Sequence, residues 1–315
     1  LREQNPNTIV TTSGDNQGGS AFVSFISDDK YTMDFVNAIG TEGSAVGNHE
    51  FDKGYKDLIE RIVPGTNNKQ LGANIFVDGK QTVDPYTIVE KDGVKVALVG
   101  TTSNLTKSKS SPANVAGVEF TDSAEQVNVE AKKIKESGKA DLVIALIHDP
   151  ADTSAPKLNP EYVDFIFGGD DHIKRLELDR DGKVPYAQSQ EYGKVVTDIA
   201  LTYDKAEKKV VKVEGKQIDA SQLEELGITP DPEVEKIVDE ADKIAKDLGQ
   251  KVVANINADF KRGSNPGDEP GSNRGTESTA NNMLAQSAVA ALSDFLDTEI
   301  DFGVMNAGGV RDDLA

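Results

Sequence analysis

The fold of this chain is decided by six consecutive apolar residues, Leu142-Val143-Ile144-Ala145-Leu146-Ile147, which end directly before His148. Continuous apolar runs of this kind are typical of strands that are buried on both faces of a sheet. Outward from this stretch, shorter runs of the same character occur at Thr8–Thr12, Ala45–Gly47, Lys95–Gly100 and Val163–Phe167. The sequence therefore predicts a sheet that is covered on both sides.

Amphipathic helical patterns separate these runs. Apolar residues recur at spacings of three and four in Lys30–Ile39, Tyr55–Ile62 and Ser123–Lys135. Two further stretches, Tyr86–Val99 and Val196–Val213, predict antiparallel hairpins. Strands that alternate with helices indicate a layered α/β domain.

The pattern changes after Val213, and this change predicts a second domain. A charged helix is expected at Pro232–Leu248, because Asp231 can cap it and proline suits its first position. A strand at Val252–Ile256 and a helix at Thr276–Leu296 follow. We therefore predict a first domain over residues 1–217, a linker over 218–230 and a second, partial domain over 231–315.

The composition excludes several classes of protein. The chain has 315 residues, 37% of them hydrophobic and 28% charged, which fits a globular protein of about two domains. No apolar run reaches the roughly 18–20 residues that a membrane span needs. The net charge of −20 disfavours a nucleic-acid polymer as partner, because a polymer requires a basic surface. The absence of cysteine leaves His, Asp, Glu and Asn as metal ligands.

All three histidines of the chain lie where an apolar run ends. His49, His148 and His172 each closely follow such a run, and Asp15 follows the first run in the same way. Each histidine alone is equally well explained as a core residue. Ligands of open α/β sheets bind outside the carboxyl ends of the strands, so the three together favour a site there. Imidazole and carboxylate groups suit zinc, manganese or iron, and two such ions can clamp a phosphate ester for in-line displacement.

Four motifs resemble those of a known family. Residues 47–52 read GNHEFD, which matches the signature of calcineurin-like metallophosphoesterases of the 5′-nucleotidase branch. Residues 13–16 (SGDN), 148–149 (HD) and 306–311 (NAGGVR) resemble further motifs of that family, in the same order. The resemblance implies a layered α/β/β/α sandwich without its first strand over 1–217. The start of an α/β 5′-nucleotidase C-terminal domain would occupy 231–315.

By this resemblance, five residues would hold two divalent ions, with zinc or manganese expected. Asp15 would bridge the ions, and Asn48 and His148 would bind the second one. His172 would bind the first. Asp170 stands where the family has the first histidine of a GHxH motif, and a carboxylate there either favours harder ions such as manganese or weakens the site. The family's Asp-x-His pair on the first strand is missing, so we expect a fragment that is cut at both ends, with the pair before its first residue.

The resemblance also assigns the catalytic residues. His49 would stabilise the transition state and protonate the leaving oxygen, while Asp52 would hold its ring. The alternative for Asp52 is a cap of the helix that follows Gly54.

In the C-terminal part, the resemblance assigns substrate binding. Arg274 and Arg311 would bind a phosphate, with Asn306, Gly308 and Gly309 in the same loop. The alternatives are ordinary surface arginines and a simple glycine turn. The aromatic pair that stacks the base in the family would lie beyond the last residue.

Together, these motifs predict a metal-dependent phosphoesterase that hydrolyses nucleoside 5′-phosphates, 2′,3′-cyclic nucleotides or both, by attack of water held between two metals. Two alternatives stay open: a non-catalytic descendant that binds nucleotide or metal, and a related phosphoesterase acting on sugar diphosphates. The expected partner is a nucleotide or a similar phosphate ester. We expect an extracellular or cell-wall location, with a signal peptide lost together with the missing N-terminus.

Overall fold

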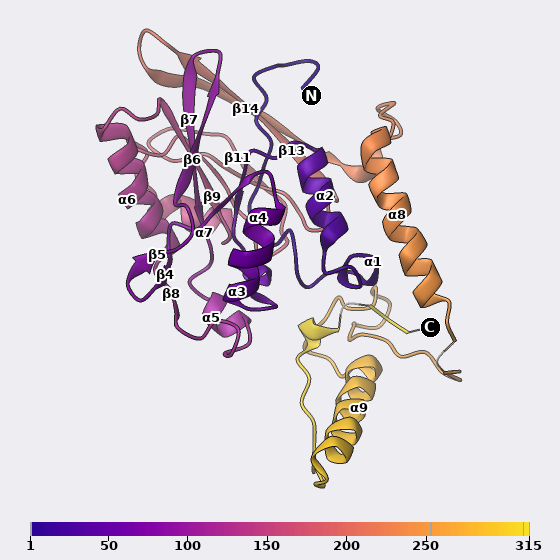
Figure 1. Ribbon diagram of the computed structural model, residues 1–315. Coiled ribbons are helices and arrows are strands. Elements are labelled where there is room, and N and C mark those ends of the chain that lie inside the picture. The colour runs from indigo at the N-terminus through magenta and orange to yellow at the C-terminus, as the bar shows by residue number, and fades with distance from the viewer. Residues whose placement is uncertain (1, 253, 311, 315) are drawn as a thin grey trace. The chain divides into compact units, whose positions relative to one another are not determined.

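The computed structural model describes residues 2–252, 254–310 and 312–314 (Figure 1). The chain divides into two compact units, residues 1–245 and residues 246–315. The division falls within helix α8 (Pro232–Gly249), so residues 218–230 lie inside the first unit. A linker and domain boundary at 218–230 stays a prediction.

A six-stranded sheet forms the centre of the first unit. Its strands are β6 (Tyr86–Lys91), β7 (Val94–Thr101), β9 (Leu142–Ile147), β10 (Phe165–Phe167), β11 (Arg175–Glu177) and β12 (Tyr186–Gln188). Their spatial order is β11-β12-β10-β9-β7-β6. The central strands β7, β9, β10 and β12 are parallel, whereas the edge strands β6 and β11 pair antiparallel with their neighbours.

The central strand β9 is buried on both faces, as its sequence predicts. All of its residues are buried. Alternate residues beginning with Leu142 belong to one hydrophobic cluster, and those beginning with Val143 belong to another. Successive side chains of a strand point to opposite faces, so the two clusters cover the two sides of the sheet.

Each hydrophobic cluster joins the sheet to another layer. On one face lies a three-stranded parallel sheet, β1 (Thr11–Thr12), β2 (Gly43–Ala45) and β3 (Lys69–Leu71), which packs through Ala45 and Leu71. On the other face lies α6 (Ser123–Glu136), whose first turn is capped by the Asp122 carboxylate. A third cluster packs Leu58 and Ile62 beneath the loop after β2. The predicted layered α/β fold is therefore confirmed.

The remaining helices of the first unit are short. They are α1 (Phe22–Phe25), α2 (Lys30–Ala38), η1 (His49–Phe51), α3 (Tyr55–Asp57), η2 (Leu58–Ile62), α4 (Val63–Gly65), α5 (Thr106–Lys109), α7 (Ala151–Ser154), η3 (Ala155–Lys157) and η4 (Ala220–Gln222). The helix predicted at Tyr55–Ile62 changes to a π-helix at Leu58. Pro64 lies just beyond and has no backbone N–H to donate, which disturbs the regular α-helical pattern.

Both predicted hairpins form. One is β6–β7, and the other is the long pair β13 (Val195–Asp204) and β14 (Lys209–Asp219). A small sheet of β4 (Ile75–Val77), β5 (Lys80–Gln81) and β8 (Val118–Phe120) completes the strands of this unit.

The second unit is built around helix α9 (Thr279–Leu296), which begins three residues later than predicted because Ser278 caps it. Its other elements are the short helix η5 (Ala307–Gly309) and a bridge between Phe260 and Leu314. The strand expected at Val252–Ile256 was wrong for the described residues 252 and 254–256, since no neighbouring strand there offers ladder hydrogen bonds.

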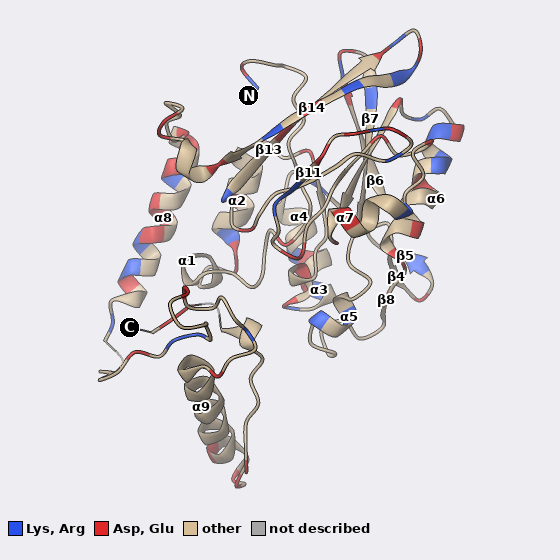
Figure 2. Ribbon diagram, turned by 180° about the vertical axis from the view of Figure 1, so that it is seen from behind, with Lys and Arg blue, Asp and Glu red and all other residues tan. Residues whose placement is uncertain are grey.

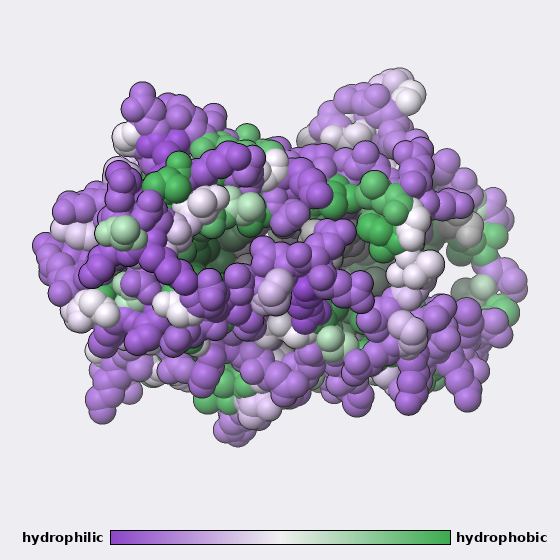
Figure 3. All heavy atoms as spheres, turned by 90° about the horizontal axis from the view of Figure 1, so that it is seen from above, coloured by the Kyte–Doolittle hydropathy of each residue, from purple (hydrophilic) through white to green (hydrophobic). Residues whose placement is uncertain are grey.

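Polar groups dominate the surface. Asp and Glu alternate with Lys along α8 (Figure 2). Hydrophilic side chains also prevail on the face drawn in Figure 3. Within the described residues, no helix combines the length and the apolar character needed to cross a membrane.

Candidate active site

The predicted site residues follow four strands. Asp15 follows β1, Asn48 and His49 follow β2, His148 follows β9, and Asp170 follows β10. β1 and β2 are parallel neighbours in one sheet, and β9 and β10 are parallel neighbours in the other. The carboxyl ends of both sheets therefore contribute to one rim.

The loops at this rim are strained and closely packed. The backbone is left-handed at Asp15 (φ 54°), Asp170 (φ 75°) and His172 (φ 62°), which is uncommon outside glycine and clusters at functional sites. A β-carbon at Gly47 would lie 2.2 Å from Asp15 Oδ1. This close approach explains why β2 ends at Ala45 and does not include Gly47 as predicted.

His148 is buried between a carbonyl and two carboxylates. Its Nδ1 donates to the carbonyl oxygen of Ser13 at 2.7 Å. Its Nε2 lies 3.0 Å from Asp15 Oδ2 and 3.8 Å from Asp170 Oδ1. The bond to the carbonyl requires a hydrogen on Nδ1, so the other nitrogen is the one that is directed at the acidic groups.

The charges of this pair stabilise each other. Burial opposes the charged form of His148, but attraction to the Asp15 carboxylate outweighs burial and raises the pKa of His148 to about 9. Burial also opposes ionisation of Asp15, yet His148 and His49 lower the pKa of Asp15 to about 2. A divalent cation that binds Nε2 must therefore displace a proton.

Asn48 and Asp170 face each other beside His148. The side-chain oxygen of Asn48 lies 3.3 Å from Asp170 Oδ1, and its amide nitrogen lies 3.2 Å from the backbone nitrogen of His49. Two acceptors at this distance repel unless the amide turns over or a cation lies between them. Asp170 also accepts from Lys109 through both carboxylate oxygens.

Glu50 organises the loops of the site, a role that our sequence analysis missed. It is 1% exposed, and its carboxylate accepts four backbone N–H groups, from Asp15, Asn16, Gln17 and Gly47, at 2.6 to 3.2 Å. Burial, with the nearby Asp15 carboxylate, raises the pKa of Glu50 to about 7. The signal was available in the sequence, because an acidic residue between His49 and Phe51 is unusual in a buried segment.

His49 forms a dyad with Asp52. Its Nδ1 lies 2.8 Å from Asp52 Oδ2, and the same oxygen accepts the backbone N–H of Gly19 at 2.8 Å. A β-carbon at Gly19 would lie 2.8 Å from the imidazole, so this glycine lets the loop lie against the ring. Asp52 does not cap the following helix, whose N-cap is Gly54 without a side-chain bond.

His172 lies apart from this cluster. It is exposed, and its ring packs edge-on against Tyr192 with centroids 5.6 Å apart. No hydrogen bond or ion pair among the described residues joins it to Asp15 or His148. The loop before it is held by Arg175, whose guanidinium donates to Asp171 at 2.8 and 2.7 Å and pairs with Asp152 at 3.0 Å. No contact shown for the described residues joins His172 to the other predicted ligands, and its role as a ligand stays a prediction.

In the second unit, most of the predicted substrate residues lie close together. The Arg274 guanidinium lies beside Gly308, where a β-carbon would approach Nη1 to 3.4 Å. A β-carbon at Gly309 would lie 2.8 Å from Asn306 Oδ1, so the loop is compact there. Arg311 is outside the described residues.

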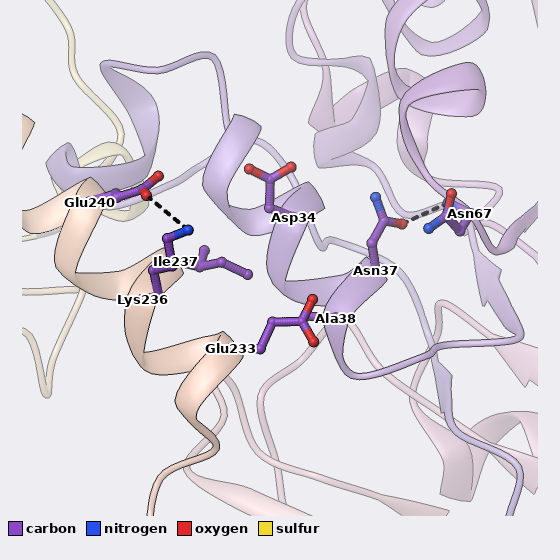
Figure 4. Close-up of a pocket in the computed structure, with 8 residues that line it drawn as sticks. All are labelled: Asp34, Asn37, Ala38, Asn67, Glu233, Lys236, Ile237 and Glu240. Carbon is purple, nitrogen blue, oxygen red and sulfur yellow. Dashed lines mark hydrogen bonds and ion pairs between the residues drawn. The ribbon is translucent and has the colours of Figure 1, made fainter.

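A groove of about 370 Å³ lies elsewhere in the first unit, between α2 and α8 (Figure 4). Its lining includes Asp34, Glu233 and Glu240, with Lys236 as the only basic group among the described lining residues. Lys236 is paired with Glu240 at 4.0 Å. The groove shares no residue with the strand-end cluster, and we assign the chemistry to the cluster.

The chain is similar in sequence to several known proteins. Endonuclease YhcR of Bacillus subtilis is 28% identical over 337 residues, which cover 99% of this chain and 26% of that protein. Cell wall protein Lmo0130 of Listeria monocytogenes is 25% identical, and the match covers 98% of this chain and 44% of that protein. A 5′-nucleotidase of Vibrio vulnificus is 24% identical, and the match covers 89% of this chain and 56% of that protein. The chain therefore spans about a quarter to just over half of the length of these relatives.

Solved structures agree in fold. The 5′-nucleotidase precursor of Thermus thermophilus matches with a TM-score of 0.71 at 21% identity, over 93% of this chain and 59% of that one. The calcineurin-like phosphoesterase YfkN of Bacillus subtilis matches with a TM-score of 0.67 at 23% identity, over 79% and 87%. The chain is thus similar in sequence to 5′-nucleotidases and in fold to calcineurin-like phosphoesterases and 5′-nucleotidases. No family model matches it.

The donor atoms of the strand-end cluster suit a divalent ion in their chemistry. Buried His148 Nε2 has no hydrogen-bond partner among the described residues, although carboxylate oxygens of Asp15 and Asp170 lie nearby. The side-chain amide of Asn48 faces the same space, 3.3 Å from Asp170 Oδ1. No three His, Asp or Glu side chains in the described part of the chain already form a metal-binding group, and Lys109 engages Asp170. Binding thus requires a small rearrangement around a suitable set of N and O ligands.

Proposed function

We propose that this chain carries the catalytic part of a metal-dependent phosphoesterase that hydrolyses nucleoside 5′-phosphates, 2′,3′-cyclic nucleotides or both. The observation that carries the proposal is the strand-end cluster of Asp15, Asn48, His148 and Asp170, directly beside the His49–Asp52 dyad. The dyad and the cluster are joined, since the backbone N–H of His49 donates to Asp15 Oδ1 at 2.8 Å.

The proposed metals are two divalent ions, zinc or manganese. Asp15, Asn48, His148 and Asp170 would hold one of them, and His172 is the proposed ligand of the other. When bound, such ions polarise the phosphoryl group as Lewis acids.

The His49–Asp52 dyad supplies the proton chemistry. Asp52 Oδ2 lies 2.8 Å from Nδ1 of His49 and orients the ring, so that Nε2 can pass a proton to the leaving oxygen. Before this transfer, the imidazolium form of the ring would also stabilise the negative charge that develops in the transition state.

The substrate would be bound by the second unit. Arg274 and Arg311 are the proposed phosphate-binding residues, because a guanidinium can hold two phosphate oxygens at once. Asn306, Gly308 and Gly309 would shape the loop beside them. A nucleotide, with few charges, suits a chain of net charge −20 better than a nucleic-acid polymer does. We also propose an extracellular or cell-wall location, supported by the similarity to a cell wall protein.

Phosphate release tests the proposal. The purified chain is incubated with AMP, 2′,3′-cyclic AMP, a sugar diphosphate and single-stranded DNA, each with Mn²⁺ or Zn²⁺ and with EDTA as control. We expect metal-dependent turnover of a mononucleotide and none of DNA. No turnover of any phosphate ester with either ion would reject an enzymatic function.

A non-catalytic binding protein is the second candidate. Two observations favour it: Asp170 is engaged by Lys109, and exposed His172 lies apart from the cluster. Binding of Mn²⁺ and AMP, measured by calorimetry, without any hydrolysis would support this candidate over the enzyme.

A further inference from the structure

Lys109 contacts the candidate site from the short helix α5. Its ammonium donates to both carboxylate oxygens of Asp170. The pair is largely enclosed, since 30% of the Lys109 side chain and 14% of the Asp170 side chain are exposed. The next residue, buried Ser110, donates its hydroxyl to the carbonyl oxygen of Asn48 at 3.2 Å. Adjacent residues of one segment thus contact two members of the cluster.

The oxygen that Lys109 binds is directed at the other donors of the site. Asp170 Oδ1 lies 3.3 Å from the side-chain amide of Asn48 and 3.8 Å from His148 Nε2. An ammonium and a divalent ion therefore compete for the same carboxylate oxygen. They also repel each other, because like charges within about 5 Å interact strongly in a partly buried site.

We propose that Lys109 is a resident cation of this site, which competes with a divalent ion for Asp170 and, once displaced, binds a phosphate oxygen of the substrate. The inference rests on the proposed function, because it assumes a divalent ion at the cluster and a phosphate ester beside it. A lysine suits both tasks, since its ammonium is a compact charge on a flexible stem.

Charge balance at the cluster supports this assignment. Asp15 and Asp170 bring two carboxylates to the rim, and Glu50 lies buried behind them. His148 pairs with Asp15 and neutralises part of this negative charge, and Lys109 neutralises the charge of Asp170. Removing Lys109 leaves Asp170 without its cation and makes the cluster more attractive to a divalent ion.

Affinity for Mn²⁺ alone tests the first half of the proposal. Free Mn²⁺ is measured by electron paramagnetic resonance during titration of the 315-residue chain and three variants. Lys109→Met removes the charge and keeps the stem, whereas Lys109→Arg keeps the charge. Lys107→Met is the matched control, because Lys107 lies on the same helix and its side chain has no ion pair among the described residues. We expect Lys109→Met to bind Mn²⁺ about tenfold more tightly, from the loss of like-charge repulsion, and the other two to match the parent.

Affinity for inorganic phosphate tests the second half. With Mn²⁺ at saturation, Lys109→Met should bind phosphate about tenfold more weakly than Lys107→Met, because it lacks one charged hydrogen-bond donor. Opposite changes in the two affinities are not expected of a residue that only supports the fold. Far-UV circular dichroism checks that each variant is folded.

The outcomes separate this inference from the proposed function. Equal Mn²⁺ affinities of the Lys109→Met and Lys107→Met variants would overturn the inference, even if nucleotides are hydrolysed. Unchanged phosphate affinity in Lys109→Met would overturn it as well. Opposite changes in a chain that hydrolyses no phosphate ester would uphold the role of Lys109 and reject the enzymatic function.

Discussion

Single side chains of the cluster have distinct tasks, and His49 is the residue proposed to act on the reacting groups. Its ring is held by Asp52. His49→Ala should lower kcat by about 10²–10⁴, the range for groups in acid–base and electrostatic catalysis. Metal content, measured by plasma mass spectrometry, should stay unchanged because the His49 ring is not a proposed ligand.

His148→Ala should behave differently from His49→Ala. His148 is a proposed ligand, so its loss should lower metal occupancy together with the rate. Raising the Mn²⁺ concentration should then restore part of the activity of His148→Ala and none of that of His49→Ala. A His49 variant that recovers with added metal would identify this residue as a ligand and contradict our assignment.

The buried carboxylate of Glu50 is proposed to hold together the loops around residues 15–17 and Gly47. Glu50→Gln replaces an acceptor oxygen by an NH2 group, which cannot accept the N–H bonds from residues 15–17 and Gly47. We expect a loss of about 1–3 kcal/mol in the free energy of unfolding, the cost of buried groups left without partners. Urea unfolding measures it. Glu60→Gln is the control, because Glu60 is exposed and its partner Lys56 lies 3.8 Å away. This variant should change the free energy of unfolding by less than about 0.5 kcal/mol. Equal losses in both variants would contradict the role of Glu50.

At the scale of elements, strand β9 holds the two layers together. Leu146 is fully buried in the cluster between the two sheets. Leu146→Ala should lower the free energy of unfolding by about 2–5 kcal/mol through lost burial and the cavity left behind. Val211→Ala on β14 is the control, since Val211 is 51% exposed, and should cost less than about 1 kcal/mol. Similar losses in urea unfolding would show that β9 is not the centre of the core.

Elements with continuous or strictly periodic apolar patterns could be predicted from the sequence. β9 has the bounds that its six apolar residues predict, and α6 differs by one residue. Errors occur where tertiary contacts override the local pattern. β2 ends early because Gly47 must approach Asp15, and the helix after Gly54 becomes π-helical near Pro64. The contact of Gly47 with Asp15 joins residues far apart in the chain, so no local pattern contains it, whereas Pro64 is a local signal that our sequence analysis did not use.

At the scale of the whole molecule, the sequence predicted which residues share a rim but not how they pair. Asp15 and His148 each follow a strand-like apolar run, and ligands bind outside the carboxyl ends of such strands, so these two residues could be placed together in advance. Lys109 could not, because α5 is a four-residue helix without a motif. His172 was placed by its position after an apolar run and by its motif, whereas its left-handed backbone and its contact with Tyr192 could not be foreseen.

The number of metal ions that the chain binds depends on which of the proposed ligands lie together. Asp15, Asn48, His148 and Asp170 form one donor set, whereas exposed His172 has none of them as a contact among the described residues. The 315-residue chain should therefore bind one Mn²⁺ tightly and a second one much more weakly, as measured by equilibrium dialysis with elemental analysis.

Two variants at neighbouring positions sharpen this measurement. Asp170→Asn should weaken the tight ion, because an amide replaces a charged oxygen ligand, whereas His172→Ala should leave its affinity unchanged. Both residues lie in the same left-handed loop, so a general disturbance of the loop would affect both variants alike. Two equivalents of Mn²⁺ held with equal affinity, or loss of the tight ion in His172→Ala, would mean that His172 turns into the cluster when metal binds, and that the two sites form together.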